Sequence, residues 1–430
     1  MIYKKIDELI GNTPLLEIPK EFHGIKNVNI YAKLEYMNPF GSLKDRIAKK
    51  MIGPVLSSKA DTVLESSSGN TAKALATLSG MNNLNFKTIT NRIKVLNIKK
   101  TLQILGAEIQ ETPHLSECPD PNDPDDPVKI AQKLADSDKK KYYYTNQYLN
   151  ELNIEAHEET GLEILNDLQE VGYFFGFLGT CGSTLGAGRV IKSENKNLKI
   201  IGVVSEIGQH IPGGRAENEL WETGFFKKEE YNEILKGTSY QAIHSMIELN
   251  RKLGMLCGPT TGLVYKKLID YLKSKEITKK TNVVFIACDR LEPYIEYVEK
   301  YDPSIFGEEI GDRLTINNCP LDVVQNAHTL KASELIENLS DYKIIDIRAN
   351  FLFQKDHIKG SINIPSEHLD NLIDNNKIFS EDDKIVFICK KGLVSKRYAA
   401  YSSLLGYESF SLEGGLEEYN NSKNKIESQS

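Results

Sequence analysis

The chain has 430 residues, of which 40% are hydrophobic, so it can form two or three domains with buried cores. Its formal net charge of −7 argues against nucleic acid as the main partner. No apolar run approaches the roughly 18 residues of a membrane-spanning helix, and the first residues lack the apolar segment of a signal peptide. We therefore expect a cytoplasmic protein without membrane contact.

The cysteines are scattered along the chain, and none forms a Cys-x-x-Cys pair. We therefore expect neither a disulfide framework nor a zinc or other metal site. The six are Cys118, Cys181, Cys257, Cys288, Cys319 and Cys389.

The first candidate catalytic residue is Lys44, which follows a predicted strand over residues 30–34. Asn38-Pro39-Phe40-Gly41-Ser42 predicts a turn that ends in a helix N-cap, so Lys44 would lie in the first helical turn. Positive charge is disfavoured there by the helix dipole, which lowers the pKa of an amine. A neutral lysine can form a Schiff base.

Two later loops are predicted anion sites because each joins a strand to a helix. Residues 66–71 follow a short strand at 62–65, and their small hydroxyl residues and glycine offer N–H and O–H donors, although such residues are also ordinary helix caps. Residues 179–184 follow a buried strand at 172–178, and their glycines allow close approach of the backbone to an anion. A helix is predicted over residues 88–108, and a further buried strand ends at residues 287–289.

Residues 306–328 show no clear helix or strand pattern, and we interpret them as a linker. A second domain is predicted at 329–420, with strands at 343–348 and 384–388. The second strand leads to Cys389, and a loop through Ser395 opens a helix. Neighbouring lysines and loop amides form the environment that lowers a thiol pKa, although a lone cysteine is more often a buried bystander. Residues 421–430 are expected to form a polar tail.

Several of these segments together resemble a known family. Gly11-Asn12-Thr13-Pro14-Leu15, residues 38–46, Ser67-Ser68-Gly69-Asn70-Thr71 and Gly179-Thr180-Cys181-Gly182-Ser183 occur in the order found in fold-type II pyridoxal phosphate (PLP) enzymes, the cysteine synthase and cystathionine β-synthase family. The resemblance covers about residues 5–300 and implies a two-lobed, doubly wound α/β domain over residues 1–305, with a homodimer as the usual assembly.

The resemblance also implies roles for individual residues. Lys44 would carry the cofactor and act as general base, and Asn70 would touch its 3′-oxygen. At the pyridine nitrogen the best alignment places Cys288, while a slip of one residue would place Asp289 there. The phosphate group would be bound by Gly179, Thr180, Cys181, Gly182 and Ser183, and the substrate carboxylate by Ser67, Ser68, Gly69, Thr71 and Gln147.

Residues 329–420 resemble a rhodanese domain, a small α/β fold with a parallel sheet. The similar segments are Asp346-x-Arg348, residues 357–365, Cys389-x-x-Gly-x-x-Ser395 and residues 412–416. The resemblance implies that Cys389 forms a persulfide, although Val394 stands where many active loops have arginine.

Together these resemblances imply β-replacement on O-acetylserine or O-phosphoserine with a sulfur nucleophile, giving cysteine, with sulfane sulfur supplied through Cys389. Two alternatives stay open. The first is cystathionine β-synthase or cysteine desulfhydrase/lyase activity, with sulfur passed to the rhodanese domain. In the second, the rhodanese domain is a non-catalytic docking module for a sulfur-carrier protein.

Overall fold

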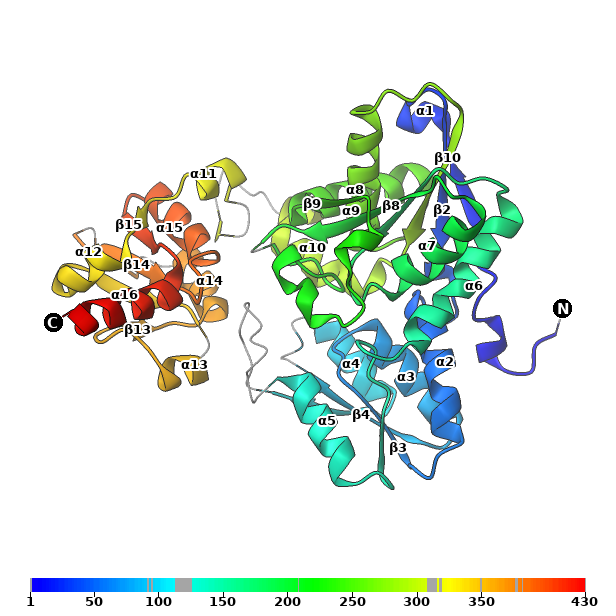
Figure 1. Ribbon diagram of the computed structural model, residues 1–430, viewed down its shortest axis with the longest axis horizontal. Coiled ribbons are helices and arrows are strands. Elements are labelled where there is room, and N and C mark those ends of the chain that lie inside the picture. The colour runs from blue at the N-terminus through cyan, green and yellow to red at the C-terminus, as the bar shows by residue number, and fades with distance from the viewer. Residues whose placement is uncertain are drawn as a thin grey trace. The chain divides into compact units, whose positions relative to one another are not determined.

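The computed structural model describes residues 2–90, 93, 96–112, 126–207, 209–307, 315–316, 319–348, 350–375, 378–380 and 382–429. The described chain divides into two compact units, one ending at Asp302 and the other beginning at Pro303 (Figure 1). Cys118 lies outside the described residues. Within the described ranges, no helix is long and apolar enough to cross a membrane.

The first unit contains a six-stranded sheet in which only the edge strand β1 is antiparallel to its neighbour. In spatial order its strands are β1 (Leu15–Ile18), β2 (Val28–Leu34), β10 (Thr281–Ala287), β7 (Tyr173–Phe177), β8 (Lys199–Ser205) and β9 (Glu233–Gly237). The central strands are mostly apolar and buried because helices cover both faces of the sheet.

Two neighbouring residues of β7 identify these two helical layers. Phe175 contacts Tyr271 of α9, whereas a Cβ at Gly176 would meet Thr184 of α7. Because successive side chains of a strand alternate, α9 and α7 cover opposite faces. Helix α8 packs against α9, and α6 packs against α7. The helices of this part are α1 (Lys20–His23), α6 (Leu152–Asp167), α7 (Gly182–Glu194), α8 (Ser239–Leu253), α9 (Pro259–Lys273) and α10 (Ile295–Tyr301).

The second sheet of this unit is fully parallel and has the order β5-β4-β3-β6. Val63 of β3 packs with α2 and α3 on one face, and Leu64 packs with α5 on the other. The bounds are β3 (Thr62–Glu65), β4 (Asn85–Thr90), β5 (Glu108–Glu111), β6 (Tyr142–Tyr144), α2 (Lys44–Leu56), α3 (Asn70–Met81), α4 (Leu96–Ile104) and α5 (Pro127–Ser137).

The helix predicted over residues 88–108 is wrong over its first part. Strand β4 continues to Thr90, because alternating Phe86, Thr88 and Thr90 fit the pleat between β3 and β5. The helix in this region, α4, begins at Leu96 and ends at Ile104.

The second unit is built on a five-stranded parallel sheet with the order β11-β15-β14-β12-β13. Phe387 of β14 packs with α14 and α15 on one face, and Val386 packs with α12 and α16 on the other. The bounds are β11 (Thr329–Leu330), β12 (Lys343–Asp346), β13 (Ile362–Asn363), β14 (Lys384–Ile388), β15 (Glu408–Leu412), α11 (Leu321–Gln325), α12 (Ala332–Glu337), α13 (Asn350–Lys355), α14 (Ser366–Asn375), α15 (Ser395–Leu404) and α16 (Gly415–Gln429).

The expected α/β class, with parallel sheets in both units, is confirmed. Two segments differ from the sequence-based expectation. Helix α11 lies within the segment interpreted as a linker, and residues 421–429, expected as a polar tail, continue α16. Helix α16 is anchored by Leu416 and Tyr419, which are buried against the sheet.

Candidate active site

Lys44 is the first residue of α2, as the turn signals predict. The preceding residue fixes this helix end to another strand, because the Leu43 N–H donates to the Cys288 carbonyl oxygen (2.9 Å). Lys44 remains partly accessible, yet burial lowers the pKa of its amine. The largest cause of the shift is therefore removal of water rather than the helix dipole that the sequence suggested.

The side chains of Ser42 and Asp45 form hydrogen bonds at the N-terminus of α2. The Ser42 hydroxyl accepts a hydrogen bond from the Lys44 N–H (3.2 Å) and donates to Asp45 (3.2 Å), and Asp45 also accepts from the Phe40 N–H (2.6 Å). Burial raises the pKa of Asp45 to about 7. The N-cap of α2 is Leu43, which makes no side-chain capping hydrogen bond, so the N-cap expected at Ser42 is wrong by one residue although the helix begins where the turn predicts.

The first predicted anion loop follows β3 and opens α3. The Ser67 hydroxyl caps the loop, accepting from the N–H groups of Gly69 and Ala72 (both 3.3 Å). Thr71 donates to Gln147 (2.7 Å), so these two predicted substrate residues come together. Both are buried, whereas Ser68 is exposed and Gly69 is half-buried. The accessible residues of this loop are therefore at its tip.

The second predicted loop follows β7 and opens α7. Cys181 has a left-handed backbone (φ 67°), which glycine adopts more easily, and its sulfur lies 3.8 Å from the Thr223 hydroxyl. Burial raises the pKa of this thiol. The Thr180 hydroxyl accepts from Asn153 (2.9 Å), while Gly179 is half-buried and Ser183 is buried in the first turn of α7. A helix start of this kind suits a phosphate group.

Gly182 shows how tightly this second loop is packed. A Cβ there would lie 2.0 Å from Oδ1 of Asn153. We expect Gly182→Ala to lower the stability of the first unit by ~1–3 kcal/mol through overpacking and to weaken PLP binding. Calorimetry and PLP titration measure the two effects. Gly80→Ala is the matched control, because a Cβ there meets nothing within 4 Å. Equal behaviour of the two variants would contradict the expectation.

Cys288 and Asp289 follow β10 and lie beside the start of α2. Both lie close enough to Lys44 to affect its pKa, as do Cys181 and Glu65. Burial raises the pKa of Cys288 to about 12 and that of Asp289 to about 6. Asp289 also accepts a hydrogen bond from Asn70 (2.8 Å). The structure thus brings Lys44, Asn70 and both candidates for the pyridine nitrogen together.

Three site residues were missed by the sequence analysis. Glu65 ends β3 and accepts from Thr145 (2.5 Å); an acidic residue after an apolar strand is a signal that was present. Burial raises the pKa of Glu65 to about 7. The Asn153 side chain donates a hydrogen bond to Thr180 of the second loop, and the Tyr294 hydroxyl donates one to Asp289. No local sequence pattern marks either residue.

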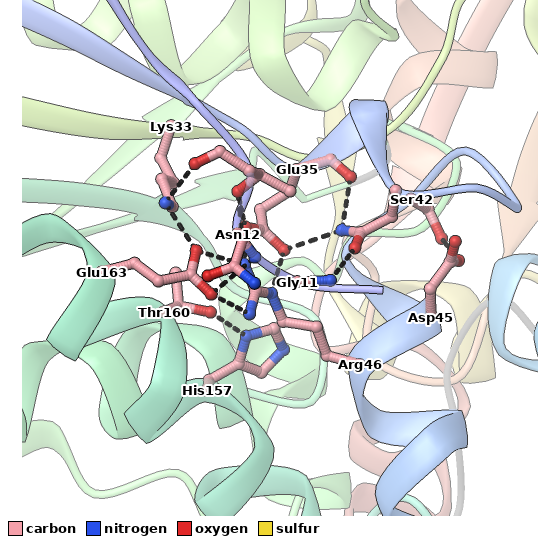
Figure 2. A network of polar contacts seen from close by, with 12 residues as sticks. Gly11, Asn12, Lys33, Glu35, Ser42, Asp45, Arg46, His157, Thr160 and Glu163 are labelled. Atoms are coloured by element: carbon pink, nitrogen blue, oxygen red, sulfur yellow. Dashed lines mark hydrogen bonds and ion pairs between the residues drawn. The ribbon is translucent and has the colours of Figure 1, made fainter. Parts of the chain in front are cut away.

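A buried polar network includes Arg46, in the first turn of α2 (Figure 2). Its centre is Arg46, which bonds to both oxygens of Glu35 (2.7 and 2.8 Å) and both of Glu163 (2.7 Å each). Lys33 joins through Glu163 (2.7 Å) and the Thr13 carbonyl oxygen (2.5 Å). The network connects β2, α2 and α6 with the segment that carries the Gly-Asn-Thr-Pro-Leu motif.

In the second unit, Cys389 follows β14 and is 3% exposed. Its sulfur lies 3.4 Å from the Ser395 hydroxyl, which lies 2.7 Å from that of Ser411. The Cys389 carbonyl oxygen accepts from the Leu416 N–H (3.1 Å). The loop is therefore tied to the start of α16, and Gly392 turns it with a left-handed backbone (φ 74°).

Comparison with known proteins identifies both parts of the chain. Residues 6–289 match the family described as pyridoxal-phosphate dependent enzyme. The chain belongs to this family. Residues 331–422, which follow the part that matches the PLP family, match the family described as rhodanese-like domain.

The relatives are cysteine synthase-like and cystathionine β-synthase-like. The PLP-family chain is 30% identical over 276 residues to cysteine synthase B of Campylobacter jejuni, covering 61% of the chain and 87% of that protein. It is 32% identical over 319 residues to cystathionine β-synthase of Apis mellifera, covering 68% of the chain and 60% of that protein. A solved hydrogen sulfide-producing enzyme of Fusobacterium nucleatum is 29% identical (TM-score 0.60; 69% of this chain, 99% of that one).

The arrangement around Lys44 fits PLP. A partly buried amine with a lowered pKa suits covalent attachment, and the loop before α7 provides a helix start for the phosphate. Asp289 adds a buried carboxylate oxygen that has no hydrogen-bond partner among the described residues.

Proposed function

We propose that the first unit replaces the β-substituent of an activated serine, O-acetylserine or O-phosphoserine, with a sulfur nucleophile to give cysteine. The observation that carries this proposal is the burial-lowered pKa of Lys44, which lies close enough to Cys181 of the second loop and to Glu65, the residue before the first loop, for both to affect it. PLP, when bound, withdraws electrons from the substrate Cα and so makes its proton acidic.

Each part of the site would have a separate role in this reaction. The Lys44 amine, neutral at lower pH than an ordinary lysine, takes the proton from Cα and later returns it. The tip of the first loop, Ser68 and Gly69, holds the substrate carboxylate. Thr71 and Gln147, which bond to each other, keep that loop in place. The start of α7 holds the cofactor phosphate.

For the second unit we propose that Cys389 carries sulfane sulfur. With thiosulfate as donor, the Cys389 thiolate attacks the outer sulfur, the S–S bond breaks and sulfite leaves. Two molecules of a small thiol then reduce the persulfide, which releases sulfide, regenerates Cys389 and leaves one disulfide. The covalent link between the units raises the local sulfide supply without requiring a new contact.

Cys389→Ser in the full chain is expected to abolish transfer of labelled sulfur from thiosulfate into cysteine, while synthesis from free sulfide continues. Labelled cysteine is measured by mass spectrometry in the presence of O-acetylserine and a thiol. Cys319→Ser, another buried cysteine of the same unit, is the control and should transfer sulfur normally. Undiminished labelling in Cys389→Ser would refute the coupling.

In a second candidate function, the first unit catalyses a different reaction: release of sulfide from cysteine, or condensation of serine with homocysteine. The Fusobacterium nucleatum and Apis mellifera relatives favour it. Product analysis separates these reactions when the enzyme receives cysteine alone, serine with homocysteine, or O-acetylserine or O-phosphoserine with sulfide. The fastest product identifies the reaction.

A third candidate makes the second unit a docking module for a sulfur-carrier protein. The burial of Cys389 and the apolar Val394 on its loop favour it. In that case Cys389 would resist alkylation in the folded chain and take up no persulfide, whereas the sulfur-relay proposal requires both reactions.

A further inference from the structure

Asp289 is a buried carboxylate of which one oxygen is bonded and the other is not. Oδ2 accepts from the Asn70 side chain (2.8 Å) and from the Tyr294 hydroxyl. Oδ1 is buried and has no hydrogen-bond partner among the residues that the structure describes. A buried carboxylate oxygen is costly without a donor, so its position indicates a ligand that brings one.

Oδ1 lies next to the backbone of residue 258, with no side chain between them. A Cβ at that residue would lie 2.4 Å from this oxygen, so only a glycine fits beside it. The Gly258 N–H is already used, because it donates to the Asp289 carbonyl oxygen (2.9 Å). The backbone of Asp289 also pairs with Ser42, which places the carboxylate next to the first turn of α2.

The charged groups around Asp289 come from several elements. Burial raises its pKa to about 6, while Lys44 of α2 and Lys73 of α3 act in the opposite direction. The titratable groups that face it are the Tyr294 hydroxyl and the thiols of Cys257 and Cys288. A further positive N–H donor would therefore stabilise the ionised carboxylate in place.

Cys288, by contrast, already has local partners for its polar groups. Its thiol donates to the Ile286 carbonyl oxygen (3.7 Å), and its N–H donates to the Thr261 hydroxyl (3.0 Å). Its own carbonyl oxygen accepts from Leu43 (2.9 Å). A thiol is also a weak hydrogen-bonding group compared with a carboxylate.

We infer that Asp289, rather than Cys288, faces the pyridine nitrogen of the cofactor and keeps that nitrogen protonated through Oδ1. The inference rests on the proposed attachment of PLP to Lys44. A carboxylate at this nitrogen makes the ring a stronger electron sink than a thiol or hydroxyl does. Such a sink matters most for substrates with poor leaving groups, so it suits serine and cysteine as well as activated serine esters.

The test is nitrogen NMR of the full chain reconstituted with PLP that carries ¹⁵N in its ring. We expect the unchanged protein to give the shift of a protonated pyridine nitrogen and Asp289→Asn, which removes the charge, to give the unprotonated shift. Cys288→Ala, the matched control at the neighbouring residue, should keep the protonated shift. Asp289→Ser serves as a second variant if Asp289→Asn loses the cofactor.

Each outcome decides one of the two proposals. An unprotonated nitrogen in the unchanged protein, or a protonated one in the Asp289 variants, overturns the inference, as does loss of the protonated signal in Cys288→Ala. Borohydride reduction and peptide mapping of the same samples report attachment at Lys44. Absence of that adduct counts against the proposed function, whereas an adduct with an unprotonated nitrogen counts only against the role of Asp289.

Discussion

Lys44→Ala is expected to remove all borohydride-trapped PLP from the protein and to lower turnover by at least ~10²–10⁴-fold, the range for loss of a general acid–base group. The reason is that one amine would serve twice, as the attachment point and as the base at Cα. Peptide mapping of the reduced protein measures the first effect, and product formation from O-acetylserine and sulfide measures the second.

Two other lysines make this experiment specific. Lys49 lies on the same helix and is exposed, so Lys49→Ala should retain both the adduct and the activity. Lys73 is the rival amine, because it is half-buried, burial lowers its pKa as well, and it lies close enough to Asp289 to affect the pKa of that carboxyl. An adduct mapped to Lys73 in the unchanged protein would refute the assignment of Lys44.

The position of Lys44 was predictable because its signals are local. The turn over residues 38–42 indicates where α2 begins, and the structure has the helix there. The cause of the lowered pKa was not predictable in the same way. Burial depends on which strands and loops surround the amine, and Cys181 and Asp289 come from positions more than 130 residues away in the sequence.

The residues that bond to the site from distant parts of the sequence were also not predictable from local patterns. Asn153 lies in the first turn of α6, and nothing near it in the sequence indicates that it bonds to Thr180 on another loop. Tyr294 reaches Asp289 only because the chain after β10 folds back toward α3. Such residues can be assigned to the site only from the folded structure, in which parallel strands bring their carboxyl ends to the same edge of the sheet.

The errors in secondary structure also have physical causes. Residues 88–90 are predicted as part of a helix with the segment that follows, but pairing with β5 keeps all three in β4, and Thr88 also pairs with β3. Residues 421–429 are polar and look unstructured alone, yet they extend a helix that is already anchored to the second unit's sheet. In both cases tertiary contacts override local preference.

The buried network around Arg46 predicts a large effect on stability. The Arg46 side chain is 1% exposed and the Glu35 side chain is 0% exposed, and they bond to each other through two hydrogen bonds. Arg46→Met would leave two carboxylates opposite a single remaining cation, Lys33. Removing one partner of a buried ion pair costs ~3–5 kcal/mol, because the other charge stays buried. We expect a loss of this size for the first unit.

Calorimetry of the full chain measures this loss as a lower unfolding temperature of the first unit. Lys266→Met is the matched control, because Lys266 forms an exposed i,i+4 pair with Asp270, and such pairs contribute only ~0.3–0.5 kcal/mol. A loss in Arg46→Met no larger than in the control would show that the network adds little to stability.

The same network predicts a dependence on acid. Burial alone would raise the pKa of Glu163, but hydrogen bonds and charge from Arg46 and Lys33 lower it to about 2. Because the folded pKa lies below the ordinary value of 4.5, this contribution is complete above about 4.5 and disappears as the pH falls toward 2. The difference in stability between the unchanged protein and Glu163→Gln should therefore shrink over that range. Since Arg46 lies two residues after Lys44, loss of the network should also loosen the start of α2 and weaken cofactor retention.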